Sequence, residues 1–149
     1  MIFSKPSEYA IRAVVYLAVN SSSNQRFGTK KIAEDLDFPE PYLGKVLQQL
    51  ARNNIISSVK GPNGGFCLEE KAMDISLLKI IESIEGLAFF SSCGLGLHDC
   101  NDEKPCPIHN DYQAFRDNFH KMLSEKTIKD MKENVDQGGA FLNIDMGVK

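Results

Sequence analysis

The sequence predicts a mainly α fold with one small β-hairpin, an α+β arrangement. Three observations predict it. Apolar residues recur at helical spacing in several separate segments. A glycine-rich run joins two short apolar segments, which indicates a hairpin. A final long stretch repeats apolar residues at steps of three and four, which is typical of a helix that packs along a seam.

The first three predicted helices lie close together in the chain. Ser4 is placed to cap the first, and Pro6 is tolerated in its first turn. We expect Thr29 to cap a second, short helix that runs to about Leu36. Pro41 opens a third helix near its first position. The apolar stripe of this third helix has the spacing i, i+3, i+4 and i+7: Leu43, Val46, Leu47 and Leu50. Two short helices joined by a tight turn indicate a helix-turn-helix motif.

A β-hairpin follows the motif directly. The apolar segments 55–59 and 66–68 flank the glycine-rich residues 60–65. A hairpin in this position is a wing, so the predicted fold is a winged helix-turn-helix domain. A fourth helix begins at Asp74 or Ser76 and ends before Gly86.

Residues 91–110 have no period and carry three cysteines, and a loop of this length usually has a function. From about Asp111 we expect one long helix, whose heptad-like seam is Tyr112, Phe115, Phe119 and Met122. This seam is explained by packing on its own domain or by a dimer helix, and we favour the dimer. The predicted domains are residues 1–86 (DNA-binding), 87–110 (cysteine-rich loop), 111–135 (dimerisation helix region) and 136–149 (flexible tail).

The composition excludes several classes of protein. The 149 residues carry a net charge of −3, unevenly distributed. Residues 1–61 contain eight Lys or Arg and five Asp or Glu, whereas the remainder is acidic, which permits a DNA-facing half. No apolar run is long enough to span a bilayer, and the N-terminus does not resemble a signal peptide. We therefore expect a cytoplasmic protein without membrane contact. No catalytic motif is evident, so we predict that the chain is not an enzyme.

The third helix is predicted to enter the major groove of double-stranded DNA, because Gln, Lys and Arg suit base edges and phosphates. A solvated helix face is the simpler explanation, but the order of helix, helix-turn-helix and hairpin favours DNA. The candidate DNA-binding residues are Thr29, Lys30, Lys31, Tyr42, Lys45, Gln48, Gln49, Arg52 and, at the wing tip, Lys60 and Asn63.

Cys93, Cys100 and Cys106 are separated by six and five residues. Zinc sites usually pair cysteines two to four residues apart, so zinc is the weaker interpretation. Iron–sulfur clusters are held by cysteine thiolates, and histidine can replace one. His109 and His98 are therefore candidates for a fourth ligand. Unliganded reactive thiols are the alternative. Cys67, between two apolar residues of the wing, is expected to be a small buried hydrophobe.

The pattern resembles the winged-helix regulators that include IscR, NsrR and CymR, over residues 1 to about 135. The resemblance lies in residues 9–13 (YAIRA), 31–34 (KIAE), 42–50 (YLGKVLQQL), 60–66 (KGPNGGF) and 84–86 (IEG). It implies a homodimer crossed by the long helix, a palindromic operator read by the third helix, and an iron–sulfur cluster near the dimer contact. In IscR-like members the fourth ligand matches His109. In NsrR-like members it is an acidic residue of the partner's first helix, which matches Glu8.

The chain departs from the family at three points. The first cysteine gap is six residues where five is usual. Lys60 replaces an arginine of the wing, which removes a bidentate donor. Gly44 lies inside the third helix, where it costs roughly 1 kcal/mol relative to alanine, and it would permit close approach to the DNA backbone.

The sequence thus predicts a transcription regulator whose operator affinity is controlled by an iron–sulfur cluster that senses redox state, nitric oxide or iron–sulfur status. A [2Fe–2S] cluster is the first choice and [4Fe–4S] the alternative. The protein would act as a repressor or an activator. Two other hypotheses stay open: a cluster-free thiol sensor of the same fold, and a small redox or cluster-carrier protein that does not bind DNA.

Overall fold

A computed structural model describes residues 2–97 and 99–142, and its described part contains six α-helices and one antiparallel hairpin. The α-helices are α1 (Lys5–Asn20), α2 (Thr29–Leu36), α3 (Glu40–Arg52), α4 (Leu77–Glu85), α5 (His109–Glu125) and α6 (Ile128–Asp136). The strands are β1 (Ser57–Val59) and β2 (Gly65–Cys67), and two short 3-10 helices are η1 (Glu70–Ala72) and η2 (Ala88–Phe90). The predicted winged helix-turn-helix is confirmed. The candidate ligand His98 and the last seven residues of the predicted tail lie outside the described residues.

The N-terminal caps were predicted with mixed success. Ser4 caps α1, and its hydroxyl accepts a hydrogen bond from the Ser7 amide. The prediction for Thr29 is wrong, because Gly28 is the N-cap of α2 and Thr29 is its first helical residue. Ser76 caps α4 through the Lys79 amide, and Gly86 ends that helix with φ 77°.

The strands of the wing are shorter than expected, and a residue outside the hairpin, Phe27, also pairs with it. β1 pairs with β2 so that Ser58 faces Phe66. Phe27, in the loop before α2, exchanges two backbone hydrogen bonds with Phe66, at 2.8 and 2.9 Å. This close approach requires Gly65, because a Cβ there would lie 2.8 Å from the Phe27 carbonyl, and its φ is 132°. The base of the wing is therefore attached to the helix-turn-helix.

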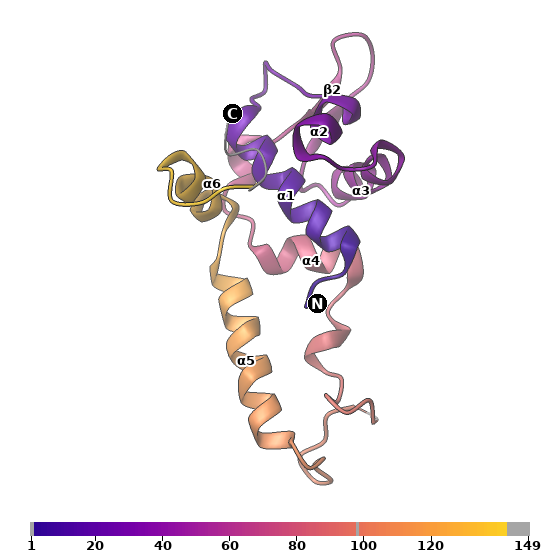
Figure 1. Ribbon diagram of the computed structural model, residues 1–149, viewed down its shortest axis with the longest axis vertical. Coiled ribbons are helices and arrows are strands. Elements are labelled where there is room, and N and C mark those ends of the chain that lie inside the picture. Colours follow the sequence, from indigo (N-terminus) through magenta and orange to yellow (C-terminus); the bar gives the residue numbers. More distant parts are fainter. Residues whose placement is uncertain (1, 98, 143–149) are drawn as a thin grey trace.

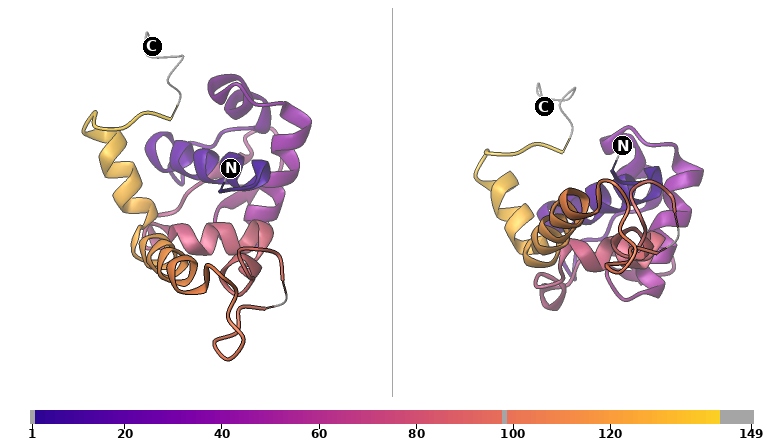
Figure 2. Two further views of the ribbon diagram at one scale, coloured as in Figure 1. Left: turned by 60° about the horizontal axis from the view of Figure 1, so that its bottom comes forward. Right: turned by 90° about the horizontal axis from the view of Figure 1, so that it is seen from below.

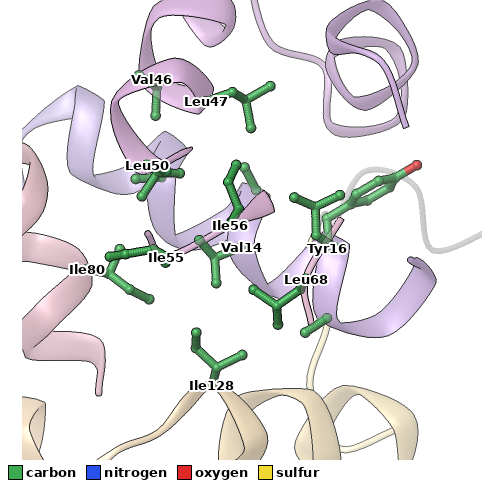
Figure 3. Packing of buried hydrophobic residues seen from close by; sticks show 14 of the residues in the cluster. Val14, Tyr16, Val46, Leu47, Leu50, Ile55, Ile56, Leu68, Ile80 and Ile128 are labelled. Carbon is green, nitrogen blue, oxygen red and sulfur yellow. The ribbon is translucent and has the colours of Figure 1, made fainter. Parts of the chain in front are cut away.

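One apolar core joins all six α-helices, with α5 contributing Leu123 near its end; Figure 3 shows part of this core. Leu17, Leu47 and Ile80 have no exposed surface. Each such side chain contributes about 1.5–3 kcal/mol by its burial. The hydroxyl of Tyr16 donates to Asp35 across α1 and α2 at 2.5 Å. Burial first, and then this carboxylate, raise the pKa of Tyr16 above its ordinary range.

The expected single helix over residues 111–135 is wrong: the chain forms two helices, α5 and α6, that meet at Thr127 (Figure 1). Thr127 and Asp130 form a capping box that starts α6. Backbone hydrogen bonds tie this junction to the residues before α4, from Leu77 N to Lys126 O (2.7 Å) and from Ile128 N to Ile75 O (3.0 Å). As a result α6 returns to pack on α1, whereas α5, like the segment that follows α4, extends away from the domain.

Further contacts hold the start and the middle of α1. The hydroxyls of Ser4 and Ser7 both donate to the carboxylate of Glu85 at the end of α4. The guanidinium of Arg12 donates to the Leu142 carbonyl at 3.1 Å, so the described start of the expected tail is held against α1. Among the described helices none has the length and apolarity to cross a membrane.

Candidate DNA interface and cysteine site

Helix α3 presents a polar face on the side opposite the core. Lys45, Gln48 and Arg52 are exposed and follow one another at steps of three and four. Because helical residues at these steps share a face, the three side chains form one stripe. Its donors suit base edges and phosphates. The three positions are thus exposed as the helical spacing predicted, and their contact with DNA stays a prediction.

Gln49 differs from the expectation that it faces outward. Its amide Nε2 donates to the carbonyl of Ser83 at 2.9 Å and reaches that of Ile84 at 3.4 Å. These carbonyls belong to the last turn of α4, whose final C=O groups have no partner within the helix. Gln49 therefore joins α3 to α4, a role that helical periodicity alone does not reveal.

Tyr42 lies at the start of α3 with 41% of its surface exposed, and its ring meets Tyr9 edge to face at 5.3 Å. Gly44 lies where α3 approaches α2. A Cβ at this position would meet Thr29 Cγ2 at 3.7 Å, an ordinary contact. Packing within the chain thus does not require glycine there.

The remaining candidate DNA contacts lie on α2 and the wing. Lys30 is exposed, whereas Lys31 forms an ion pair with Asp35 at 3.0 Å on the same helix. Lys60 and Asn63 are exposed at the wing tip. The structure thus presents cations beside α3, on the preceding helix and on the wing.

The cysteine loop, residues 91–108, runs from η2 to α5, and Figure 2 shows it beside the start of α5. Its first half closes on itself. The amide of Cys100 donates to the Ser91 carbonyl at 3.0 Å, and Ser92 pairs with Asp99. The predicted loop boundary at residue 110 is slightly late, because α5 already begins at His109.

His109 is buried, although its neighbours in sequence are exposed. Its Nδ1 lies 3.4 Å from Cys100 Sγ, and its Nε2 lies 2.8 Å from Asp102 Oδ1. A carboxylate that binds the far nitrogen orients an imidazole, as it does beside histidine metal ligands. Asp102 was not predicted from the sequence, since nothing in its spacing indicates this contact.

Cys93 and Cys106 form a second group. The Leu95 amide lies 3.4 Å from Cys93 Sγ. This amide lowers the pKa of the Cys93 thiol, with smaller contributions from the Leu97 amide and the Cys106 thiol within hydrogen-bonding reach. All three loop cysteines are half-buried and unpaired by disulfides. The fourth, Cys67, is fully buried in the wing, as predicted.

Over residues 2–97 and 99–142, no three His, Cys, Asp or Glu side chains converge as ligands of a single metal ion. Instead, Cys100 contacts His109, and the Cys106 side chain contributes to the lowered pKa of the Cys93 thiol. Thiolate and imidazole are the ligands that iron–sulfur clusters use, so the donor set fits such a cluster. Glu8, the other candidate, forms an ion pair with Lys5 at 3.2 Å on α1.

The apolar residues predicted as a seam on the long helix do not all lie in the same environment. Phe119 packs against Phe3 and Phe90 of the same chain, with ring centroids 5.8 and 5.9 Å apart. Phe115 and Met122 are 47% and 44% exposed. Helix α5 thus packs on its own domain through one side and leaves an apolar side open. His120, on the same helix, contacts the Phe90 ring at the surface.

Comparisons with known proteins agree with this architecture. Solved structures of the same fold include CymR, the global cysteine regulator of B. subtilis (TM-score 0.74, 21% identity, 89% of this chain and 97% of that one). Another is T. potens IscR (TM-score 0.73, 21% identity, 95% and 93%).

Sequence relatives are regulators rather than enzymes. A putative HTH-type transcriptional regulator of Aquifex aeolicus is 32% identical over 133 residues, which cover 88% of this chain and 91% of the relative. The HTH-type transcriptional regulator NsrR of Oceanobacillus iheyensis is 25% identical over 146 residues, 97% and 99% of the two chains. The Rrf2 family profile, described as an iron-dependent transcriptional regulator, matches residues 3–134. The chain therefore belongs to the Rrf2 family of transcriptional regulators.

Proposed function

We propose that this regulator binds a palindromic operator as a homodimer, and that its operator affinity depends on an iron–sulfur cluster held by Cys93, Cys100, Cys106 and His109. The observation that carries the proposal is the contact of His109 Nδ1 with Cys100 Sγ at 3.4 Å. It brings a buried imidazole from the first turn of α5 to a loop cysteine. The family description as iron-dependent supports the same assignment.

The two pairs of donors favour a [2Fe–2S] cluster. Each iron of such a cluster has two protein ligands, as in centres where two histidines coordinate one of the two irons. Cys93 with Cys106 and Cys100 with His109 would supply one pair each. A [4Fe–4S] cluster, with the same four ligands, is the alternative.

Three conditions would favour binding of a cluster at this site. Asp102 orients His109 through Nε2 and leaves Nδ1 for the metal. The loop brings the three thiols to one end of α5. In the cytoplasm, where thiols stay reduced, the cysteines keep the form that ligation requires. A bound cluster would supply a centre that responds to redox state, nitric oxide or iron–sulfur status.

The open side of α5 supports the homodimer. Phe115 and Met122 are exposed there, and so is Ile2 at the N-terminus. Exposed apolar residues along one helix are typical of an association surface. A dimer about this helix would present two copies of α3, and a dimer reads half-sites at a fixed spacing. A Phe115→Asp variant should be monomeric in light scattering coupled to gel filtration, whereas Lys121→Asp, on the same helix, should remain dimeric.

The recognition surface supports specific DNA binding. In the proposed complex Lys45, Gln48 and Arg52 face the major groove, while Lys30 and Lys31 of α2 lie near phosphates. Lys60 and Asn63 of the wing would reach the backbone or the minor groove. Tyr42 and Thr29, at the starts of α3 and α2, complete the proposed surface.

The test is anaerobic purification, followed by iron and sulfide analysis and a visible spectrum. We expect about two irons and two sulfides per chain for the favoured cluster, and loss of both in His109→Ala. Glu8→Ala is the matched comparison and should retain its iron. A colourless wild-type protein after reconstitution with iron and sulfide would contradict the proposed cluster.

The cluster-free thiol sensor has its own supporting observation. The pKa of the Cys93 thiol is lowered, first by the Leu95 amide and to a smaller extent by the Cys106 side chain. A low-pKa thiol beside a second cysteine suits disulfide formation. If the colourless protein loses operator affinity with peroxide and regains it with reductant, this second function is correct.

A further inference from the structure

Arg116 lies on α5 with only 6% of its surface exposed, although guanidinium groups are seldom buried without several partners. Its Nη1 donates to the Ser92 carbonyl at 3.1 Å. Its Nε is buried and has no hydrogen-bond partner among the described residues. Burial of a cation that makes one hydrogen bond among the described residues is costly for stability, which indicates that the contact serves another purpose.

Tyr112, one turn earlier on α5, contacts the same segment of the loop. The Arg116 guanidinium carbon lies 5.9 Å from the centroid of its ring. The ring also faces Gly94 so closely that a Cβ at Gly94 would lie 2.9 Å from three ring atoms. Ser92 and Gly94, the two neighbours of Cys93, therefore both rest on α5.

These contacts hold more than one residue of the loop. Ser92 pairs with Asp99, and the Cys100 amide donates to the Ser91 carbonyl at 3.0 Å. Because these bonds join residues 91 and 92 to residues 99 and 100, an attachment at Ser92 and Gly94 fixes the positions of both Cys93 and Cys100. His109 already belongs to α5.

We propose that Tyr112 and Arg116 form a seat, here called the α5 seat, that fixes the loop bearing Cys93 and Cys100 to helix α5 and couples the state of the cysteines to that helix. Both are positioning residues. The seat itself is a property of the metal-free chain. Its regulatory consequence rests on the proposed function, since α5 is the proposed dimer helix.

Hydrogen–deuterium exchange of the reduced, metal-free protein tests the seat. In Arg116→Ala we expect the amides of residues 91–100 to exchange about tenfold faster or more, which corresponds to the loss of one hydrogen bond from a charged donor. Exchange in α1, α3 and α4 should be unchanged. Lys121→Ala, which removes an exposed cation from the same helix, should match the wild type throughout.

A matched pair at Tyr112 separates the ring from its hydroxyl. Tyr112→Phe retains the face that meets Gly94, so its loop should exchange like that of the wild type. Tyr112→Ala should release the loop as Arg116→Ala does. Gly94→Ala should also release it, because the new methyl group would lie too close to the ring. Unchanged exchange of residues 91–100 in Arg116→Ala, or an equal acceleration over the whole chain, would overturn the proposal.

The coupling is tested by operator affinity with and without the cluster. In Arg116→Ala the ratio of the two affinities should move toward one, while Lys121→Ala keeps the wild-type ratio. An unchanged ratio in Arg116→Ala would overturn the coupling. If the wild type holds no cluster, the proposed function fails, and the exchange experiment still decides whether the seat exists.

Discussion

The helix-turn-helix body and the cysteine loop are stabilised by different kinds of interaction. In the body, apolar side chains from all six helices share one core, and leucines such as Leu17 and Leu47 are wholly buried. In the loop, Leu95 and Leu97 are 51% and 64% exposed. The conformation of the loop therefore depends on a few hydrogen bonds and on its contacts with α5. Segments with few buried apolar contacts open at lower free energy than a core. We therefore expect the helix-turn-helix body to keep its shape and the cysteine loop to change its conformation more readily.

The largest expected effect contrasts one substitution in the two regions. Leu47→Ala should lower the free energy of unfolding by about 2–5 kcal/mol, because it removes fully buried methyl groups. Leu95→Ala, in the loop, should change it by less than about 0.5 kcal/mol. Urea denaturation measures both. Similar losses of stability in the two variants would show that the loop belongs to the cooperative core and would contradict the contrast between the two regions.

The second prediction separates two adjacent glutamines of α3. Gln48→Ala should weaken operator binding by about 1–3 kcal/mol if the side chain reads a base, with unchanged stability. Gln49→Ala should lower the free energy of unfolding by about 1 kcal/mol, because the bonds to Ser83 and Ile84 are lost. DNA-binding titrations and denaturation of the same samples distinguish the two. A reversed pattern would remove Gln48 from the recognition stripe.

The third prediction concerns Gly44. Since a Cβ there makes only an ordinary contact with Thr29, Gly44→Ala should stabilise the fold by about 1 kcal/mol through helix propensity. If the DNA backbone approaches α3 closely, the same variant should bind the operator more weakly. Ala51→Gly, on the same helix, is the reverse substitution and should destabilise. Unchanged operator affinity in a stabilised Gly44→Ala protein would remove the close-approach hypothesis.

The smallest effect is a pH dependence at the start of α6. The Thr127 amide lowers the pKa of the Asp130 carboxyl, so the folded protein favours its ionised form. The resulting stability is present above the ordinary aspartate pKa of about 3.9 and is lost as the pH falls through the lower folded value. Asp130→Asn should therefore lose less stability than the wild type between neutral and acidic pH. Thermal melts over that range measure it, with Asp117→Asn on α5 as the control.

Much of the body could be predicted from the sequence because its signals are local. Helical spacing identified α1, α2, α3 and α4, and the glycine-rich run identified the wing. The cap at Thr29 was missed because Gly28 has no side chain to signal a cap. The break between α5 and α6 was missed although Thr127 and Asp130 form a capping pattern. The heptad spacing suggested continuity, and the pairing with residues 75–77 is a long-range contact.

At the candidate site, too, some features could be predicted from the sequence and others could not. Cysteine spacing, and the position of His109 after the last cysteine, were visible in the sequence. The roles of Asp102, Tyr112 and Arg116 were not, because each depends on which face of α5 meets a loop without periodicity.

Most of the helices, the order of helix-turn-helix and wing, and the family resemblance could be predicted from the sequence. Each of these depends on propensity and on spacing along the chain. The tertiary structure alone decided that Gln49 serves α4, that α6 returns to α1, and that the cysteine loop rests on α5. The physical reason is that these contacts join residues distant in sequence. Their free energy exists only once the core has brought the helices together.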